Sequence, residues 1–304
     1  MQLDSLLPPR EVSVLAGASG AGKSTLILQF LQAWLSNQSF LGVPPPPQQI
    51  AYLVGDRSIH ALQHRAKDVG LDLDALRHAS LVDDPDIDIK RFRVDPLALL
   101  FSLLDALKGP LFIVDPLIVF LGVDLNRYNL VAPQLIRLNR FCQARGYTVL
   151  GTHHTTKART DFQFLRPQDR ISGSSALSAF TSTQLALTSP DEVQHNLPLL
   201  EAAARLDVIS HVAAPETHWL SRDKLGLFTP LGPEAEKILQ VCGPAGLAVY
   251  QVIPPGQSLE TAEILATLDG VASRATIFRQ LEKLVAANIL HREERGRYRH
   301  ASVH

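Results

Sequence analysis

A glycine-rich run, GASGAGKST at residues 17–25, has the residue types and spacing of a phosphate-binding loop. Gly17, Gly22, Lys23 and Ser24 match the pattern Gly-x-x-x-x-Gly-Lys-Ser/Thr. In such a loop the backbone N–H groups surround the β-phosphate, the lysine reaches the β- and γ-phosphate oxygens, and the hydroxyl binds Mg²⁺. We therefore expect ATP and Mg²⁺ as ligands. The expected nucleotide contacts are Gly17, Ala18, Ser19, Gly20, Ala21, Gly22, Lys23, Ser24 and Thr25.

Two carboxylates follow apolar runs that predict buried strands. Asp56 ends IAYLVGD and Asp115 ends LFIVD, which places both at the carboxyl edge of a parallel sheet, where ligands of open α/β folds bind. We expect Asp115 to hold Mg²⁺ together with Ser24, and Asp56 to polarise the attacking water. The alternative for Asp115 is an aspartate that caps a turn before Pro116, and the alternative for Asp56 is a solvated loop residue.

A further run, GTHHTTK at residues 151–157, places polar groups at the tip of another predicted strand. His153, His154, Thr155 and Lys157 could sense the γ-phosphate and transmit its loss, and His154 is the residue to which we assign this role. A zinc site is a poor alternative, because adjacent residues of an extended chain point to opposite faces.

The elements that must position these groups alternate between short apolar runs and helical patterns up to about residue 187. This alternation predicts an α/β fold with a mainly parallel sheet sandwiched by helices. PPPP at residues 44–47 predicts a stiff connector. Residues 188–229 are expected to add edge strands. With 304 residues, we expect one large domain, 1–229, and a small one, 230–304.

The small domain has three amphipathic helical patterns and then a segment with a glycine turn, which is typical of a winged helix-turn-helix. From Val271 onward it has seven Arg or Lys against three Glu, a net charge of +4 in a chain of net charge −1. A helix that begins at Ser273 would present base and phosphate contacts, and alternating arginines along the wing would share one side. The expected DNA contacts are Arg274, Thr276, Arg279, Arg295, Arg297 and Arg299. The alternative is a protein-docking or oligomerisation module whose arginines keep it soluble.

Two cysteines, Cys142 and Cys242, are far apart and lie in apolar helical patterns, so we expect buried, reduced thiols. The first residues lack a basic start followed by a long apolar run, and no apolar stretch is long enough to span a bilayer. These features predict a cytoplasmic protein without a membrane partner.

The motifs GASGAGKST, IAYLVGD, LFIVDPL, GTHHTTK and RISGSSALSAF resemble, in order and spacing, those of RecA-like ATPases, and are most similar to RepA-type plasmid replicative helicases. The resemblance covers about residues 1–190 and implies a RecA-like fold, ATP hydrolysis, action on DNA and a homo-oligomer in the form of a hexameric ring. In that family the catalytic base is usually Glu with an acidic neighbour. In this sequence Asp56 and Arg57 stand at the matching positions. The shorter carboxylate of Asp56 predicts slow hydrolysis.

Family members also carry a basic residue near the GSS turn that reaches the nucleotide of the neighbouring subunit. Ser172 stands directly before Gly173 here, which leaves Arg170 as the catalytic finger, with Arg166 and Arg159 as alternatives.

Two classes of function therefore remain open. The complete phosphate loop and the sensor strand favour a ring-forming helicase or DNA-remodelling motor. Asp56 and the displaced arginine favour an ATP-gated DNA-binding regulator or loader that does not unwind DNA. A small-molecule kinase is a third and weaker alternative, because no acceptor-binding lid is evident and the basic C-terminal segment would have no role.

Overall fold

The computed structural model describes residues 3–46, 49–83, 94–154, 175–188 and 203–301. The chain forms two compact units, each of which is described by itself. The first unit comprises Met1–Ser189, Arg205–Thr217 and Lys224–Phe228, and the second comprises Pro190–Ala204, His218–Asp223 and Thr229–His304.

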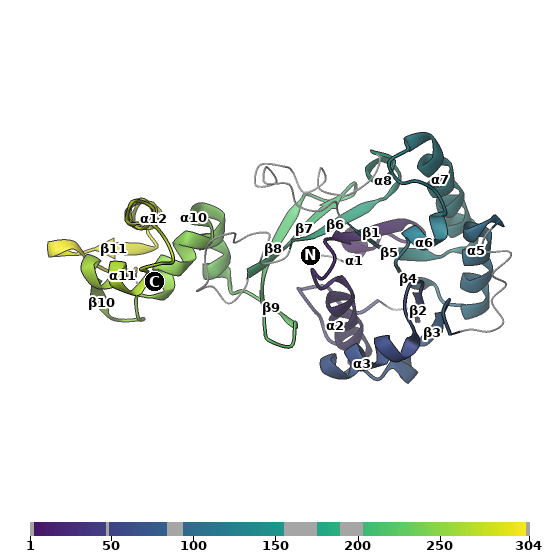
Figure 1. Cartoon of the computed structure of the whole chain (residues 1–304), viewed down its shortest axis with the longest axis horizontal. Coiled ribbons are helices and arrows are strands. Elements are labelled where there is room, and N and C mark those ends of the chain that lie inside the picture. The colour runs from purple at the N-terminus through teal and green to yellow at the C-terminus, as the bar shows by residue number, and fades with distance from the viewer. Residues whose placement is uncertain (1–2, 47–48, 84–93, 155–174, 189–202, 302–304) are drawn as a thin grey trace. The chain divides into compact units, whose positions relative to one another are not determined.

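Most of the large sheet in Figure 1 belongs to the first unit. Among the described residues, the order of strands in this sheet is β3-β2-β4-β5-β1-β6-β7-β8-β9. Every pair from β3 to β6 is parallel, and β6 and β7 are antiparallel. The strands are β1 (Val12–Gly17), β2 (Ile50–Val54), β3 (Arg77–Ser80), β4 (Leu111–Asp115), β5 (Thr148–His154), β6 (Thr183–Thr188), β7 (Ala203–Ser210), β8 (Glu216–Arg222) and β9 (Phe228–Pro230).

Helices cover both faces of this sheet. On one face, Leu26 and Phe30 of α2 line a small apolar cavity with Leu15 and Leu150 of the strands. On the other face, a large apolar core joins the strands to α5, α7 and α8. The helical elements of this unit are α1 (Leu3–Leu6), α2 (Lys23–Leu35), α3 (Ile59–Val69), the 3₁₀ turn η1 (Leu73–Ala75), α5 (Pro96–Leu107), α6 (Ile118–Leu121), α7 (Tyr128–Arg145) and α8 (Ser175–Phe180).

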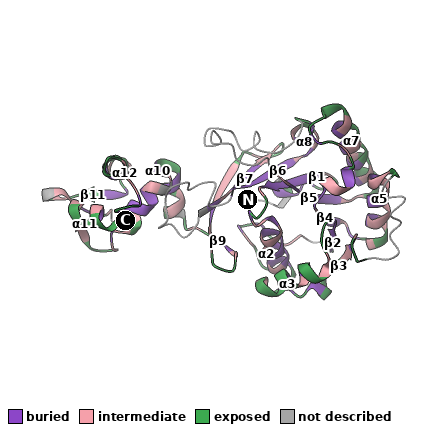
Figure 2. Cartoon of the chain, in the orientation of Figure 1, coloured by how far each residue is buried: buried purple, intermediate pink, exposed green. Residues whose placement is uncertain are grey.

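Burial on both faces explains why the central strands are mostly apolar and do not alternate with exposed polar residues. Every residue of β1, β2 and β6 is buried, and Figure 2 shows the strands at the centre of the sheet in purple. Parallel strands under two helical layers have no solvated face, so they lack the alternation of polar and apolar residues. The predicted parallel sheet between helices is confirmed, and β7, β8 and β9 confirm the predicted edge strands.

The strand register brings the predicted chemical groups to one edge. Val54 of β2 pairs with Asp115 of β4, and Gly17 of β1 pairs with His154 of β5. Because these strands are parallel, their carboxyl ends meet at the same edge of the sheet. The phosphate loop, Asp56, Asp115 and His154 therefore all start from this edge.

In its described residues, the second unit contains three α-helices around an apolar core. Helix α10 has a kink at Gly243, whose φ of 68° lies in the left-handed region. Ile238, Ile264 and Ile277 come from the three helices and are fully buried. The elements in chain order are α10 (Pro233–Gln251), β10 (Ser258–Glu260), α11 (Thr261–Thr267), α12 (Arg274–Ala286), β11 (Leu290–Arg292), η4 (Glu294–Gly296) and β12 (Arg297–His300), and the three strands form an antiparallel sheet in the order β10-β12-β11.

The predicted alternation of three arginines along one strand is wrong. Arg295 lies in the 3₁₀ turn η4, and only Arg297 and Arg299 belong to β12, with the buried Tyr298 between them. Gly296 adopts a φ of 73°, which ends the turn in the left-handed region and breaks the period-two pattern.

Cys142 and Cys242 are both buried and free, as predicted. Burial raises the pKa of Cys142 to about 12, which keeps this thiol protonated and unreactive. Among the helices that the structure describes, none is both long enough and apolar enough to cross a bilayer.

Candidate functional site

The phosphate-type loop connects β1 to α2 with the geometry that its glycines allow. Gly20 and Gly22 have φ values of 80° and 99°, in the region that glycine enters at little cost. A Cβ on Gly17 would lie 2.7 Å from the carbonyl oxygen of Leu187. Side chains at these positions would distort the loop, so the sequence leaves its backbone N–H groups free to approach a ligand closely.

The ammonium group of Lys23 lies over this loop, although the side chain is almost completely buried. Its Nζ donates to the carbonyl oxygens of Gly17, at 2.8 Å, and Ala18, at 3.0 Å. The Nδ1 atom of His154 lies 3.3 Å from the same Nζ. A buried cation at the start of a helix adds to the positive end of the helix dipole, and the two together favour an anion.

The carboxylate of Asp115 gathers hydroxyl groups from three elements. Its Oδ2 accepts hydrogen bonds from Ser24 Oγ and Tyr52 OH, each at 2.7 Å. Its Oδ1 accepts a short hydrogen bond from Thr152 Oγ1. Ser24 thus gives its one hydroxyl hydrogen to Asp115 and keeps its lone pairs for another partner.

This donor set fits Mg²⁺ bound to a nucleotide. A hydroxyl oxygen with a neighbouring carboxylate is a typical protein contribution to magnesium, which is held by few side chains, phosphates and water. Ser24 would bind the ion, and Asp115 would hold the Ser24 hydroxyl and the water around the ion. When bound, Mg²⁺ would neutralise charge on the phosphates.

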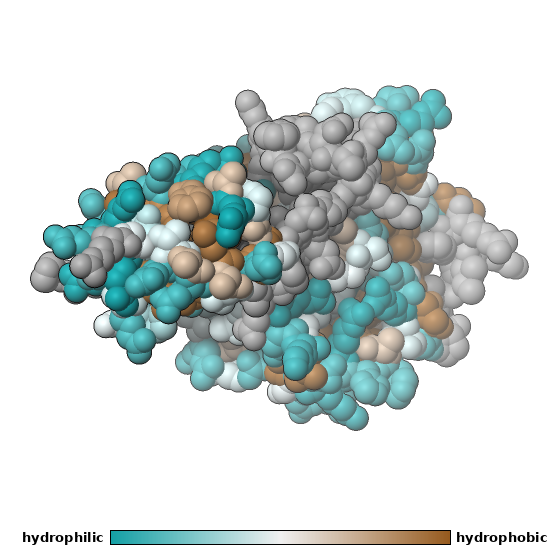
Figure 3. Space-filling view, turned by 60° about the vertical axis from the view of Figure 1, so that its left-hand side comes forward, coloured by the Kyte–Doolittle hydropathy of each residue, from teal (hydrophilic) through white to brown (hydrophobic). Residues whose placement is uncertain are grey.

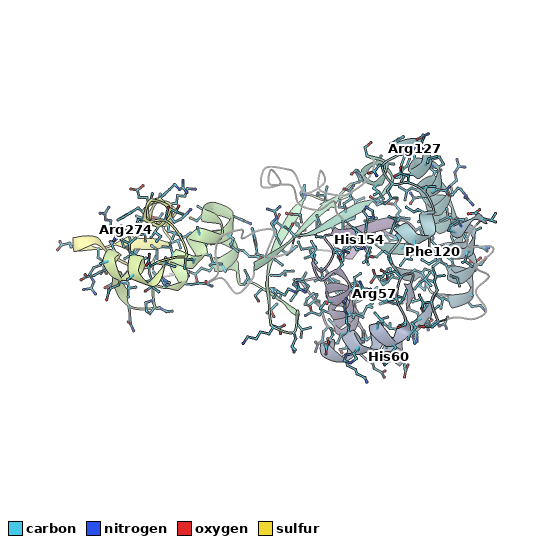
Figure 4. All side chains as sticks on the ribbon, viewed as in Figure 1. Arg57, His60, Phe120, Arg127, His154 and Arg274 are labelled. Carbon is cyan, nitrogen blue, oxygen red and sulfur yellow. The ribbon has the colours of Figure 1, made fainter. Side chains whose placement is uncertain are left out.

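Asp56 follows β2 at the same edge and is exposed. The Nε atom of Arg57 lies 3.6 Å from its carboxylate, and both side chains are more than one third exposed. Figure 4 shows Arg57 and His154 in this unit. An exposed pair of this kind contributes little stability, so the carboxylate can turn toward water at the edge of the sheet.

His153 and His154 point to different environments, as predicted from strand alternation. His153 is buried and His154 is half-buried. Burial first, and the charge of Lys23 second, lower the pKa of His154 from its ordinary value of 6.5. At neutral pH His154 is therefore uncharged, and its Nδ1 accepts from Lys23. The described residues contain no cluster of three His, Cys, Asp or Glu side chains that could hold a metal ion.

Several predicted residues lie outside the described residues. They are Arg170 and its alternatives Arg159 and Arg166, together with Thr155, Lys157 and Ser172.

The basic residues of the second unit differ in their surroundings. Arg274 and Arg279 of α12 are exposed, and Figure 4 marks Arg274 beside this helix. The Ser273 hydroxyl caps α12 by accepting from Thr276 N at 3.2 Å, and it also shares a hydrogen bond with the Thr276 hydroxyl. Thr276 is therefore partly engaged within the helix start.

The two arginines of β12 are engaged with acceptors of this chain. Arg297 donates to the carbonyl oxygen of Ser258 at 3.2 Å and lies 3.8 Å from the carboxylate of Glu260. Arg299 forms an ion pair of 3.0 Å with Glu293. Their charges are partly compensated before any partner is bound.

Sequence reasoning missed Tyr52 and Thr152, although both contact Asp115. Tyr52 is the only polar side chain of β2, in the run IAYLV, and it is fully buried. A buried hydroxyl almost always has a hydrogen-bond partner. The single tyrosine in this otherwise aliphatic strand could therefore have indicated a hydrogen-bond partner near the carboxyl edge of the sheet.

Comparison with known proteins agrees with this geometry. Residues 3–160 match a family described as an AAA domain, AAA_25. This match spans half of the chain, and the chain belongs to that family. No curated protein matches it.

Among solved structures, the chain is similar to a KaiC-like protein from the hyperthermophilic archaeon Pyrococcus horikoshii OT3. The identity is 13%, the TM-score is 0.51, and the match covers 75% of this chain and 95% of that one. Together, the fold, the family and the loop identify a RecA-like P-loop ATPase.

Removal of the Lys23 ammonium tests the phosphate loop. In Lys23→Ala we expect kcat/KM for ATP to fall at least about 100-fold, because a preorganised cation at developing negative charge contributes a factor of this size. Steady-state phosphate release measures the change, and thermal unfolding checks the fold. Lys67→Ala, at an exposed position of α3, is the control that should behave as wild type. Equal turnover in Lys23→Ala would refute the assignment of the loop.

The lowered pKa of His154 predicts a pH effect on stability. As pH falls through 6.5, the ordinary value, the unfolded chain takes up a proton before the folded chain does. Protonation of His154 therefore does not affect the stability of the fold above pH 6.5, and it destabilises the fold below that pH. In His154→Asn, the asparagine amide keeps a polar group near the position of the imidazole Nδ1, but this side chain does not titrate. In urea unfolding between about pH 7 and 5, His154→Asn should lose less stability than wild type, and an identical pH dependence would contradict the assigned environment.

Proposed function

We propose that this ATPase acts on DNA as a ring-forming helicase or DNA-remodelling motor, with the second unit as its DNA-binding winged helix. The observation that carries the DNA assignment is the exposed pair Arg274 and Arg279 on α12. This helix is the third of the unit and precedes its β-hairpin, which is the place of a recognition helix.

The second unit supports this assignment by its order of elements. Helix α10, strand β10, helices α11 and α12, and strands β11 and β12 follow one another. In this order α12 packs one face into the core through Ile277, Leu281 and Leu284. Arg279 lies on the opposite face, and Arg274 is exposed at the first residue of the helix, so both are accessible to the major groove of duplex DNA, which is about as wide as one helix.

Hydrolysis would depend on the polar groups at the sheet edge. Lys23 would bind the β- and γ-phosphates, Asp56 would polarise the attacking water, and His154 would register the γ-phosphate through its contact with Lys23. Since the Asp56 carboxylate is one methylene shorter than the usual glutamate, we expect slow basal hydrolysis.

A ring would place a catalytic cation of one subunit beside the nucleotide of its neighbour. Charge that develops on the transferred phosphoryl group is commonly stabilised by an arginine from a neighbouring subunit. We assign this role to Arg170, and a hexamer is the assembly that the resemblance to replicative helicases favours.

A second candidate function is an ATP-gated DNA-binding regulator or loader. Asp56 in place of the usual glutamate favours it, because a shorter catalytic base suits a slow switch better than a fast motor. Phe278 on α12, which is 46% exposed, also leaves protein docking as the alternative use of this helix. Figure 3 shows hydrophobic residues among hydrophilic ones at the left of the view, where the second unit lies.

Salt dependence of DNA binding tests the role of α12 in the full chain. Each neutralised phosphate contributes a slope of about −0.9 to the plot of log affinity against log salt. Arg274→Ala and Arg279→Ala should each reduce the size of the slope by about one unit. Arg145→Ala is the matched control, because this exposed arginine of the first unit pairs with Asp105. If duplex and single strands show no salt-dependent binding, α12 is a docking surface and the DNA role is lost.

Mixed assemblies test the role of Arg170 between subunits. Arg170→Ala should bind ATP normally and lose turnover by about 10³-fold or more, as expected for an arginine finger. A mixture with Lys23→Ala should regain activity, because some interfaces then combine an intact loop with an intact finger. Phosphate release across mixing ratios measures this, and a strictly additive result would argue against a shared site.

A further inference from the structure

The hydroxyl groups around Asp115 suggest a role for two residues that the loop motif does not contain. We propose that Tyr52 and Thr152 are positioning residues which fix the Asp115 carboxylate, and that they thereby set the affinity of the nucleotide site for Mg²⁺. The inference rests on the proposed binding of Mg²⁺ and ATP at this site.

Tyr52 lies in the middle of β2 and is fully buried. Its hydroxyl donates to Oδ2 of Asp115 at 2.7 Å. The backbone position of this donor is fixed, because β2 and β4 are paired along their whole length.

Thr152 holds the other carboxylate oxygen. It lies in β5, is fully buried, and donates to Oδ1. Its backbone carbonyl also accepts from Leu117 N at 2.9 Å, just after Asp115 in the chain. The carboxylate is thus held from β2 on one oxygen and from β5 on the other, so it cannot rotate freely about its terminal bond.

The consequence falls on Ser24. Since Oδ2 also accepts the Ser24 hydroxyl, the orientation of the carboxylate determines where the Ser24 hydrogen points, and hence where its lone pairs point. Groups that form hydrogen bonds with metal-binding side chains, without touching the metal, change metal affinity by about 10- to 100-fold. Tyr52 and Thr152 occupy such positions relative to Ser24 and Asp115.

The simpler interpretation is that Tyr52 only needs an acceptor for a buried hydroxyl. In that case, removal of the hydroxyl would change stability and leave metal binding untouched. A measurement of metal affinity without turnover therefore separates a structural role from a positioning role.

The experiment compares Tyr52→Phe with Tyr147→Phe in the full chain. The Tyr147 hydroxyl also donates to an aspartate, Asp105, at 3.0 Å, but it precedes β5 at the opposite edge of the sheet. Binding of Mn²⁺ to the ADP-loaded protein is followed by electron paramagnetic resonance, and ADP affinity is measured separately in EDTA. We expect Tyr52→Phe to bind Mn²⁺ about 10- to 100-fold more weakly, with unchanged affinity for metal-free ADP. Tyr147→Phe should match wild type in both.

Two further variants keep the inference testable if Tyr52→Phe is unstable. Thr152→Val removes the donor on the other oxygen, preserves the side-chain shape, and should weaken Mn²⁺ binding in the same way. In an Asp115→Asn background, loss of the Tyr52 hydroxyl should have no further effect on Mn²⁺.

The outcomes distinguish the inference from the function on which it rests. If wild type binds no ADP, or binds Mn²⁺ no better with ADP than without it, the proposed nucleotide site fails. If wild type shows the metal site but Tyr52→Phe and Thr152→Val bind Mn²⁺ as wild type does, the positioning role is overturned while the nucleotide site stands.

Discussion

The site depends on the hydrogen bonds of the Asp115 carboxylate, because they connect α2, β2, β4 and β5. One oxygen holds Ser24 and Tyr52, and the other holds Thr152. The buried hydroxyls of Tyr52 and Thr152 would be costly without an acceptor, and a carboxylate at this edge would be poorly defined without donors. The parallel register, in which Val54 lies beside Asp115, brings these groups into reach. The fold and the chemistry therefore place the same demand on this position.

Lys23 shows a second side of the same arrangement. Its ammonium is bound by two carbonyl oxygens of the loop and lies next to an uncharged His154. A bound phosphate would replace these contacts. The ammonium group would then exchange one set of acceptors for another, and it would not have to lose a shell of water. Because desolvation of a charge is costly, keeping this cation dry but paired lowers the cost of forming the site. His154 lies within reach of that exchange, which is what a sensor of the γ-phosphate requires.

The sequence was sufficient where local chemistry dictates structure, and insufficient where partners come from far along the chain. The glycine spacing predicted the loop, and the apolar runs predicted β1, β2, β4 and β5. The edge strand β3 and helix α5 were missed, since RHAS is short and half-polar and α5 is apolar on most sides. Tyr52 and Thr152 were missed because their role depends on strand order, with 63 and 37 residues separating them from Asp115. Strand order is a tertiary property that periodicity does not encode.

The arginines of the second unit show the same limit. The alternation of Arg295, Arg297 and Arg299 predicted three charges on one side of the wing, but the backbone places Arg295 in a turn, and acceptors of the chain engage Arg297 and Arg299. An exposed ion pair contributes little stability, yet it reduces the charge that a phosphate would meet. The exposed arginines of α12, Arg274 and Arg279, have no ion pair among the described residues. If this unit binds DNA, its electrostatic attraction must therefore come from α12 more than from the wing, and the strands serve mainly to hold that helix in place.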